Sequence, residues 1–179
     1  MKPIVSPQTR VRYPEHFHIG DFSIVDDYCY FSTRIAIGQC SHIATGCSIA
    51  GGVGRQFTLG DFCSLSAGVR IWCTSNDFAN DLVALLPAGV DPIHQIEGDV
   101  ALADYTGVGA NSVVMPGNVV PDGTVMGALS FVPPHFAFEP WSVYAGSPIR
   151  LVGRRNRDNV SAQADRLRRQ LAALREARE

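Results

Sequence analysis

The stretch IGDFSIVDDYCYFSTRIAIGQCSHIATGCSI, from Ile19 to Ile49, carries an aliphatic or aromatic residue at every sixth position. The same period returns from Leu59 and again from Leu102, and the apolar anchors are Ile19, Val25, Phe31, Ile37, Ile43, Ile49, Leu59, Leu65, Ile71, Leu102, Val108, Val114, Val120, Met126 and Val132. A period of six fits neither an α-helix nor a plain strand, but it is typical of a hexapeptide β-helix. Each six-residue repeat forms one rung, and a rung buries its apolar face only when it stacks on other rungs. We therefore predict an all-β solenoid.

Small residues recur at the bends of this repeat. The position four places after the anchor holds a small side chain in most hexads: Ser23, Cys29, Ser41, Cys47, Cys63, Thr106, Ser112, Thr124 and Ser130. The five cysteines are odd in number and lack C-x-x-C spacing, so we interpret them as core or corner residues and not as disulfides, ligands or nucleophiles. Glycine often follows the anchor, as Gly38 and Gly109 do, and we expect it to supply a positive φ at the bend.

The composition is that of one globular domain, since 46% of the 179 residues are hydrophobic. A net charge of −2 gives no global field for nucleic acid or an anionic membrane. Nine of the arginines lie between Arg150 and Arg178 beside four acidic residues, and this segment is either a solubilising tail or a contact for phosphates. No long apolar segment follows Met1 or occurs elsewhere, from which we expect a soluble cytoplasmic protein.

Two motifs late in the repeat resemble a known family. GVGANSVVMPG, from Gly107 to Gly117, is similar to the W-I-G-A-N-x-x-I-x-P-G stretch of the hexapeptide-repeat acyltransferases. YAGSPIR, from Tyr144 to Arg150, is similar to their Y-A-G-x-P-A-K/R ending. The resemblance covers roughly residues 17–157 and is nearest to the sugar O- and N-acetyltransferases. It implies a left-handed parallel β-helix of triangular section with three hexads per turn, hence about five turns here.

Three hexads per turn make the two interruptions of the period interpretable. Four extra residues enter after Ile49, and the register lost after Ile71 resumes only at Leu102. Both interruptions follow whole turns, so we expect both insertions at one corner of the triangle, with Gly51–Gly54 beside the loop at about 74–99. A long loop in a solenoid with short corners is usually functional.

The chain divides into three parts by this interpretation. Residues 1–18 form an N-terminal arm, in which the segment from Arg10 to Tyr13 is a candidate edge strand. Residues 19–137 form the β-helix with its long loop, and residues 138–179 form a C-terminal turn and an α-helix. The helix is predicted from the apolar spacing of Val160, Ala164, Leu167, Leu171 and Leu174.

Acyl transfer from a thioester needs an acceptor nucleophile, a base and donors for the oxyanion. The resemblance implies that the donor, acetyl-CoA or another acyl-CoA, lies between adjacent subunits of a homotrimer and that the mid-helix loop supplies the base. Where many members read G-x-N-H, this chain reads Ser75-Asn76-Asp77. Either Asp77, assisted by Asn76, is the base or orienting group, or the pair caps a turn. His94 in the loop is a further catalytic candidate.

A carboxylate at the base position favours one acceptor. Its ordinary pKa near 4 makes it a weak base for a sugar hydroxyl, whereas an amine needs only to be oriented and to lose a proton late. We therefore predict N-acetylation of a nucleotide-linked aminosugar in O-antigen or capsule synthesis. O-acetylation of a saccharide hydroxyl, favoured by a histidine such as His42 or His94 at the thioester carbon, is the alternative, and a non-catalytic assembly module is a remote one.

The resemblance also carries over cofactor residues, position by position. It implies that the Ala110 N–H faces the thioester and that the Ala128 main chain contacts the pantetheine arm. Gly146 and Pro148 match the segment that turns past the adenine.

Charged contacts to the cofactor are less well defined. Arg150 and Arg154 are suitably placed for its 3′-phosphate or diphosphate. The family's V-T-K-D-V-P-P is FVPPH here, from Phe131 to His135. The phosphate lysine is therefore missing, and one of the two arginines or His135 must replace it.

The remaining histidines give weaker signals. His42 precedes the anchor Ile43 and should face outward, as a ligand contact or as a plain surface residue. His16 and His18 form an H-x-H pair, but two ligands make a weak metal site, and the three-histidine zinc site of carbonic anhydrases on this fold lacks its spacing here. We expect no metal.

Overall fold

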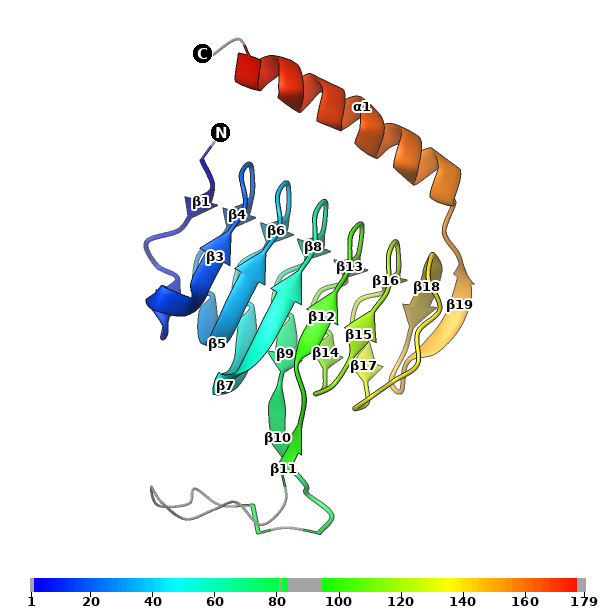
Figure 1. Cartoon of the computed structure of the whole chain (residues 1–179). Coiled ribbons are helices and arrows are strands. Elements are labelled where there is room, and N and C mark those ends of the chain that lie inside the picture. The colour runs from blue at the N-terminus through cyan, green and yellow to red at the C-terminus, as the bar shows by residue number, and fades with distance from the viewer. Residues whose placement is uncertain (1, 81, 84–94, 177–179) are drawn as a thin grey trace.

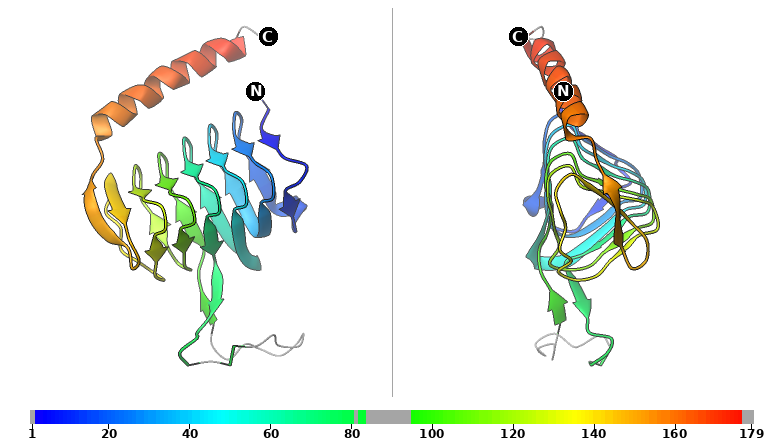
Figure 2. Two further views of the ribbon diagram at one scale, coloured as in Figure 1. Left: turned by 180° about the vertical axis from the view of Figure 1, so that it is seen from behind. Right: turned by 90° about the vertical axis from the view of Figure 1, so that its right-hand side faces the viewer.

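The computed structural model describes residues 2–80, 82–83 and 95–176. It is a β-solenoid of about 6 turns with one C-terminal helix, and its section is triangular (Figure 2). The parallel sheets fit the left-handed β-helix that the family resemblance implies. Every predicted anchor from Val25 to Val132 is buried in the core, and Ile19 packs against them partly buried. The predicted fold class is confirmed.

Face 1 of the triangle is an eight-stranded sheet (Figure 1). Its strands follow one another along the coil in parallel, except that the last is antiparallel to its neighbour. In order they are β1 (Ile4–Val5), β4 (Ile24–Val25), β6 (His42–Ile43), β8 (Ser64–Leu65), β13 (Gly107–Val108), β16 (Val125–Met126), β18 (Ser142–Ala145) and β19 (Arg150–Arg154).

A second sheet bends around one corner, because β5 (Tyr30–Ile37) and β7 (Ser48–Leu59) run through that corner without a break. Their first halves form face 2 with β2 (Arg10–Val11), β9 (Arg70–Trp72), β14 (Val113–Val114) and β17 (Phe131–Val132). Their second halves form face 3 with β3 (Phe17–Ile19), β12 (Val100–Leu102) and β15 (Val119–Val120). The short 3-10 helix η1 (Pro14–His16) leads from β2 to β3.

The coil has one turn more than the five counted from the period. Two strands of the first turn, β1 and β2, precede the first counted anchor and pair in parallel with β4 and β5, and β18 continues the coil after the last anchor. Arg10 lies opposite Tyr30 in this register, so the predicted edge strand exists as part of face 2. Val5 and Val11 are six residues apart, but eight residues separate Val11 from Ile19, so an interruption of the period separates these two strands from the first counted anchor.

The glycines that follow the anchors have a different purpose from the one predicted. Gly38 and Gly109 do not have positive φ; a Cβ at Gly109 would lie 2.3 Å from the Ala128 nitrogen. Glycine is needed there because the backbone of the next turn leaves no room for a side chain. Positive φ occurs later in the bend, at Phe62 (56°) and Leu129 (57°).

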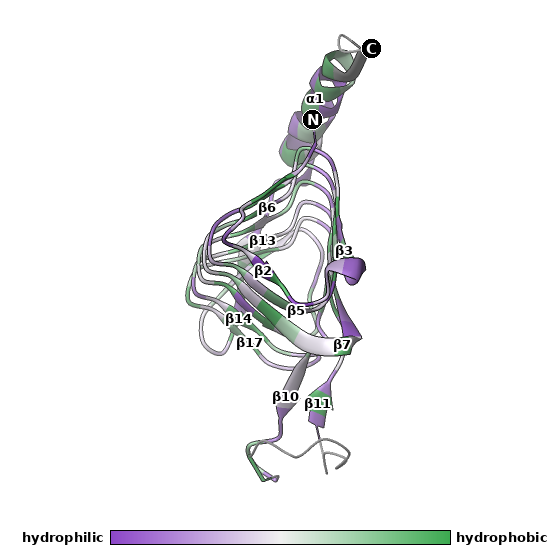
Figure 3. Ribbon diagram, turned by 90° about the vertical axis from the view of Figure 1, so that its left-hand side faces the viewer, coloured by the Kyte–Doolittle hydropathy of each residue, from purple (hydrophilic) through white to green (hydrophobic). Residues whose placement is uncertain are grey.

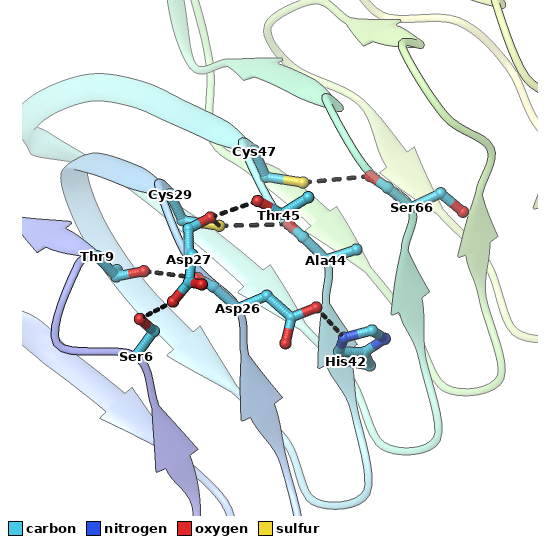
Figure 4. A network of polar contacts seen from close by, with 10 residues as sticks. All are labelled: Ser6, Thr9, Asp26, Asp27, Cys29, His42, Ala44, Thr45, Cys47 and Ser66. Carbon is cyan, nitrogen blue, oxygen red and sulfur yellow. Dashed lines mark hydrogen bonds and ion pairs between the residues drawn. The ribbon is translucent and has the colours of Figure 1, made fainter.

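The cysteines are packing residues, as predicted. All five are free. The thiols of Cys29 and Cys47 donate to the carbonyl oxygens of Ala44 at 3.3 Å and Ser66 at 3.2 Å, each in the next turn (Figure 4). These contacts tie neighbouring turns together at one corner.

The C-terminal helix α1 (Arg157–Glu176) lies along the outside of the coil (Figure 1). It contacts a ladder of stacked rings, Phe62, Tyr105 and Trp141, whose neighbouring centroids are 5.8 Å apart. Phe62 and Tyr105 come from successive turns, and the Trp141 ring lies over Gly123 of the turn between Tyr105 and Trp141. Arg168 lies over Phe62 at 4.9 Å and Arg157 over Trp141 at 5.6 Å. Part of the arginine-rich segment therefore packs the helix by cation–π contacts. In the part of the chain that is described, no helix has the length and apolarity to cross a membrane.

Candidate active site

The three corners of the triangle carry different features (Figure 3). The hairpin corner, between faces 2 and 3, extends into the antiparallel strands β10 (Thr74–Asn76) and β11 (Gln95–Glu97). The alanine corner, between faces 1 and 2, consists of the turns at residues 109–112 and 127–130. The helix corner, between faces 3 and 1, carries the ring ladder under α1. Any site built from two corners must therefore span a face of the coil.

Both interruptions of the repeat meet at the hairpin corner, as predicted. The β10–β11 stem leaves the coil beside the bulge of β7, and the Thr74 hydroxyl donates to the Gly51 carbonyl oxygen at 3.2 Å. Arg55 in the bulge forms an ion pair with Glu97 in β11, and this contact holds the pKa of Glu97 below its usual value. The root of the hairpin is thus braced against the coil on both strands.

Asp77 directly follows β10 and begins a turn. Its Oδ1 accepts hydrogen bonds from the N–H groups of Ala79 (2.9 Å) and Asn80 (3.3 Å), and its Oδ2 accepts one from Asn80 Nδ2 (2.6 Å). The turn cap considered from sequence is therefore present. A carboxylate accepts about four hydrogen bonds, so capping does not exclude catalysis. Asn76 pairs with Gln95 in the stem, and His94 lies outside the described residues.

Cys73 lies at the root of the hairpin and is the thiol nearest to Asp77 in sequence. It is buried, and this burial raises the pKa of the thiol to about 11. The thiol is therefore protonated near neutral pH, and since the thiolate is the reactive form, Cys73 is not a nucleophile.

The residues predicted to contact the cofactor backbone form a column along the alanine corner. Ala110, Ala128 and Gly146 follow one another at intervals of one turn, as the strand register shows for the neighbouring pairs Val108–Met126 and Met126–Tyr144. The Ala110 carbonyl oxygen accepts the N–H of Leu129 at 2.9 Å. The column is thus a continuous strip of backbone with hardly any side chain.

The N–H groups of this strip differ from those of the helix corner. At the helix corner, the N–H of Gln39 and that of Asp61 each donate to an aspartate of the next turn, at 2.8 Å. Within the described residues, no hydrogen bond uses the N–H of Ala110 or of Ala128. Two backbone donors at the alanine corner are therefore available to a ligand.

The end of the column holds the predicted adenine and phosphate contacts. Gly146 has φ 107° and donates its N–H to Ser130 Oγ at 3.2 Å, and Pro148 follows a cis peptide bond. Arg154 is already engaged by Ser142 Oγ at 2.7 Å and by Glu139. Arg150 is exposed in β19, which leaves its guanidinium the more accessible of the two.

The histidines are distributed over different parts of the coil. His42 faces outward from face 1, as predicted, and its Nε2 lies 2.8 Å from Asp26 Oδ2 (Figure 4). His135 lies at the hairpin corner against Gly117, where a Cβ would come within 2.2 Å of the imidazole. His135 and the Gly146 end of the column therefore lie on different corners, with face 2 between them.

The predicted catalytic and cofactor residues lie on two corners of one chain. Asn76 and Asp77 belong to the hairpin corner, and Ala110 and Ala128 to the alanine corner. The strands β9, β14 and β17 of face 2 lie between the two corners. A single chain does not bring these residues together.

Sequence reasoning missed a pocket on face 3 beside the hairpin corner. It is lined by His16, His18, Arg34, Ile35, Ala36 and Gln56. The H-x-H pair gave a partial signal, but nothing in the sequence linked it to Arg34, which comes from the next turn.

No family model matches the chain, but comparison with known proteins finds relatives that are acyltransferases. An Escherichia coli dTDP-4-amino-4,6-dideoxy-D-glucose acyltransferase is 27% identical over 148 residues, which are 80% of this chain and 74% of that protein. AntD, an N-acyltransferase from Bacillus cereus solved with dTDP and 3-hydroxybutyryl-CoA, superposes with a TM-score of 0.81 at 26% identity, over 93% of this chain and 88% of AntD.

A more distant likeness concerns the fold only. A maltose O-acetyltransferase from Clostridium difficile superposes with a TM-score of 0.62 at 20% identity, over 78% of this chain and 70% of that one. The likeness to AntD, by contrast, includes nearly the whole chain. The hairpin corner and the alanine corner both lie within a fold that it shares with a solved acyltransferase.

Proposed function

We propose that this chain, which is a member of the hexapeptide-repeat acyltransferases, transfers an acyl group from acyl-CoA to the amine of a nucleotide-linked aminosugar. The observation that carries this proposal is the likeness to AntD over 93% of the chain, since AntD was solved with dTDP and an acyl-CoA. A variant of AntD was also solved with dTDP-4-amino-4,6-dideoxyglucose and coenzyme A. Acetyl is the acyl group that we expect here.

The separation of the two corners supports a site shared between subunits. In a ring of identical chains, different surfaces of neighbouring subunits meet at every interface. A homotrimer would place the hairpin corner of one subunit against the alanine corner of the next, with acyl-CoA between them. Asp77 and Ala110 would then act on one thioester from two chains.

The chemistry follows from the groups at the two corners. The neutral amine attacks the thioester carbonyl carbon, so that a C–N bond forms and negative charge develops on the carbonyl oxygen. The Ala110 N–H stabilises that oxygen as a preformed donor. The amine proton passes to the Asp77 carboxylate, the C–S bond breaks, and the protonated Asp77 passes this proton to the leaving thiolate of coenzyme A. Asn76 orients the acceptor beside Asp77.

The charged end of the cofactor would lie at the end of the column. Gly146 and Pro148 turn the chain past the adenine, and Arg150 contributes a guanidinium to the phosphates. Arg154 can do so only by exchanging its contact with Glu139. We expect the reaction in the cytoplasm, as a step in the synthesis of a surface polysaccharide such as O-antigen or capsule.

The test is thiol release from acetyl-CoA with a matched panel of acceptors. The panel pairs dTDP-4-amino-4,6-dideoxyglucose with the same nucleotide sugar carrying a hydroxyl at carbon 4, and adds a free aminosugar and a neutral oligosaccharide. We expect release with the aminosugar nucleotide and background rates with its hydroxyl counterpart. Release with hydroxyl acceptors alone would establish the O-acetyltransferase instead. Repeating the series with 3-hydroxybutyryl-CoA identifies the preferred acyl group.

A further inference from the structure

The pocket on face 3, hereafter the Arg34 pocket, has a volume of about 150 Å³. Its walls come from three adjacent parallel strands and from η1. Arg34 in β5 lies opposite Gln56 in β7, and Ala36 lies opposite His18 in β3. The side chains of these residues point away from the core because they alternate with buried neighbours such as Ile35. The small Ala36 leaves the space between the longer side chains open.

Among the residues that the structure describes, the Arg34 guanidinium has no protein partner. Its Nε is buried without a hydrogen bond, and in the described residues no hydrogen bond or ion pair involves the group. Other arginines of the coil are engaged: Arg55 by Glu97, and Arg70 by the carbonyl oxygens of Gly46 and Gly68. A buried donor without an acceptor costs free energy. The two terminal nitrogens of Arg34 are not among the buried unsatisfied atoms, and they are the donors that can reach a ligand in the pocket.

The lining of the pocket is suited to an anion. It contains a guanidinium, two imidazoles and a carboxamide, and no carboxylate. Of the nearby acids, Glu15 lies 3.9 Å from His16 Nε2, and Asp99 is held by the N–H of Gln56 at 3.0 Å. A planar guanidinium that presents paired N–H donors matches the oxygens of a phosphate.

We propose that the Arg34 pocket binds the diphosphate of the nucleotide sugar, with Arg34 as its main ligand and with His18 and Gln56 as additional donors. The identity of the anion rests on the proposed function, whereas the site itself rests on the pocket and the unpartnered guanidinium. Gln56 joins the pocket to the hairpin, since its N–H contacts Asp99 and its neighbour Arg55 contacts Glu97. A diphosphate held here lies beside the segment that carries Asp77.

Calorimetric titration of the full-length protein with inorganic diphosphate, dTDP and coenzyme A tests the site. The variant is Arg34→Gln, and the control is Arg166→Gln, which removes the same charge from an exposed position of α1. Loss of a charged hydrogen-bond donor weakens binding by about ten-fold or more. We expect that loss for both diphosphate and dTDP in Arg34→Gln, and no change in the affinity for coenzyme A or in the control.

Several results would overturn the site. Equal affinity of native protein and Arg34→Gln for dTDP would do so, as would the absence of diphosphate and dTDP binding to the native protein. A change of oligomeric state in Arg34→Gln, with nucleotide affinity preserved, would assign Arg34 to a subunit contact. His18→Gln provides a second variant, expected to weaken dTDP binding less than Arg34→Gln does.

The outcome for the site and that for the enzyme are distinguishable. If inorganic diphosphate binds through Arg34 but no aminosugar nucleotide is acylated, the anion site stands and the proposed function fails. If the aminosugar nucleotide is acylated at native KM by Arg34→Gln, the function stands and the site fails.

Discussion

The Asp77→Asn variant is expected to lose acyl transfer by about 10²- to 10⁴-fold in kcat, the usual contribution of a general base. The KM for both substrates should change little, because the amide retains the size of the carboxylate and can still accept a hydrogen bond. Oδ1 remains available to the N–H groups of Ala79 and Asn80, which cap the turn. The substitution therefore removes the proton acceptor and preserves most of the local fold. Steady-state thiol release at saturating acetyl-CoA measures the effect.

A matched control separates catalysis from turn capping. Asn80→Ala removes the donor to Asp77 Oδ2 and disturbs the turn while leaving the carboxylate in place. We expect this variant to retain most of its kcat. Full activity of Asp77→Asn would exclude Asp77 as the base, and equal losses in both variants would assign it a capping role only.

The Gly109→Ala variant is expected to damage the alanine corner. The added Cβ would lie 2.3 Å from the Ala128 nitrogen and 2.5 Å from the Gly127 carbonyl carbon, so the backbone of one turn must move. Overpacking of this kind costs about 1–3 kcal/mol of unfolding free energy. A displacement of about 1 Å at a site that positions substrate lowers the rate by about 10²-fold. Urea unfolding at one protein concentration and thiol release measure the two effects.

Gly54→Ala is the matched control for this substitution. Gly54 lies in the bulge of β7, where an added Cβ meets nothing within 4 Å and φ is not in the left-handed region. Its unfolding midpoint and its acetyl-CoA kinetics should equal those of the native protein. Native stability in Gly109→Ala would show that the turns are less tightly stacked at this corner than their geometry indicates.

Much of the fold follows from sequence because the core of a solenoid is a one-dimensional pattern. Each anchor from Val25 to Val132 faces inward for the same reason, and the two lapses of the period mark the hairpin corner directly. The strands at Ile4 and Arg10 were not counted because the period is interrupted between Val11 and Ile19, and their pairing with the second turn is a property of the folded coil. The contact of α1 with the coil could not be predicted from the sequence either, because it depends on rings such as Tyr105 that stack only after the coil has formed.

The candidate site was predictable to a smaller extent. The column of Ala110, Ala128 and Gly146 has a fixed interval of one turn, so a motif could locate it. The position of Asp77 in its loop could also be predicted from the sequence, but its hydrogen bonds to the following turn could not. Arg34 could be placed only on an outward position of a strand. That its guanidinium has no partner among the described residues is a property of the packed coil, and no local sequence pattern contains it.

Subunit mixing tests most directly the central claim that the hairpin corner of one chain and the alanine corner of another form one site. Asp77→Asn and Gly109→Ala, each nearly inactive alone, are co-expressed with different tags and purified as mixed oligomers. A mixed trimer of either composition has about one interface in three that combines an intact hairpin with an intact alanine corner. We therefore predict recovery of about a third of the native thiol release. Mixed oligomers no more active than the two variants measured separately would contradict the shared site.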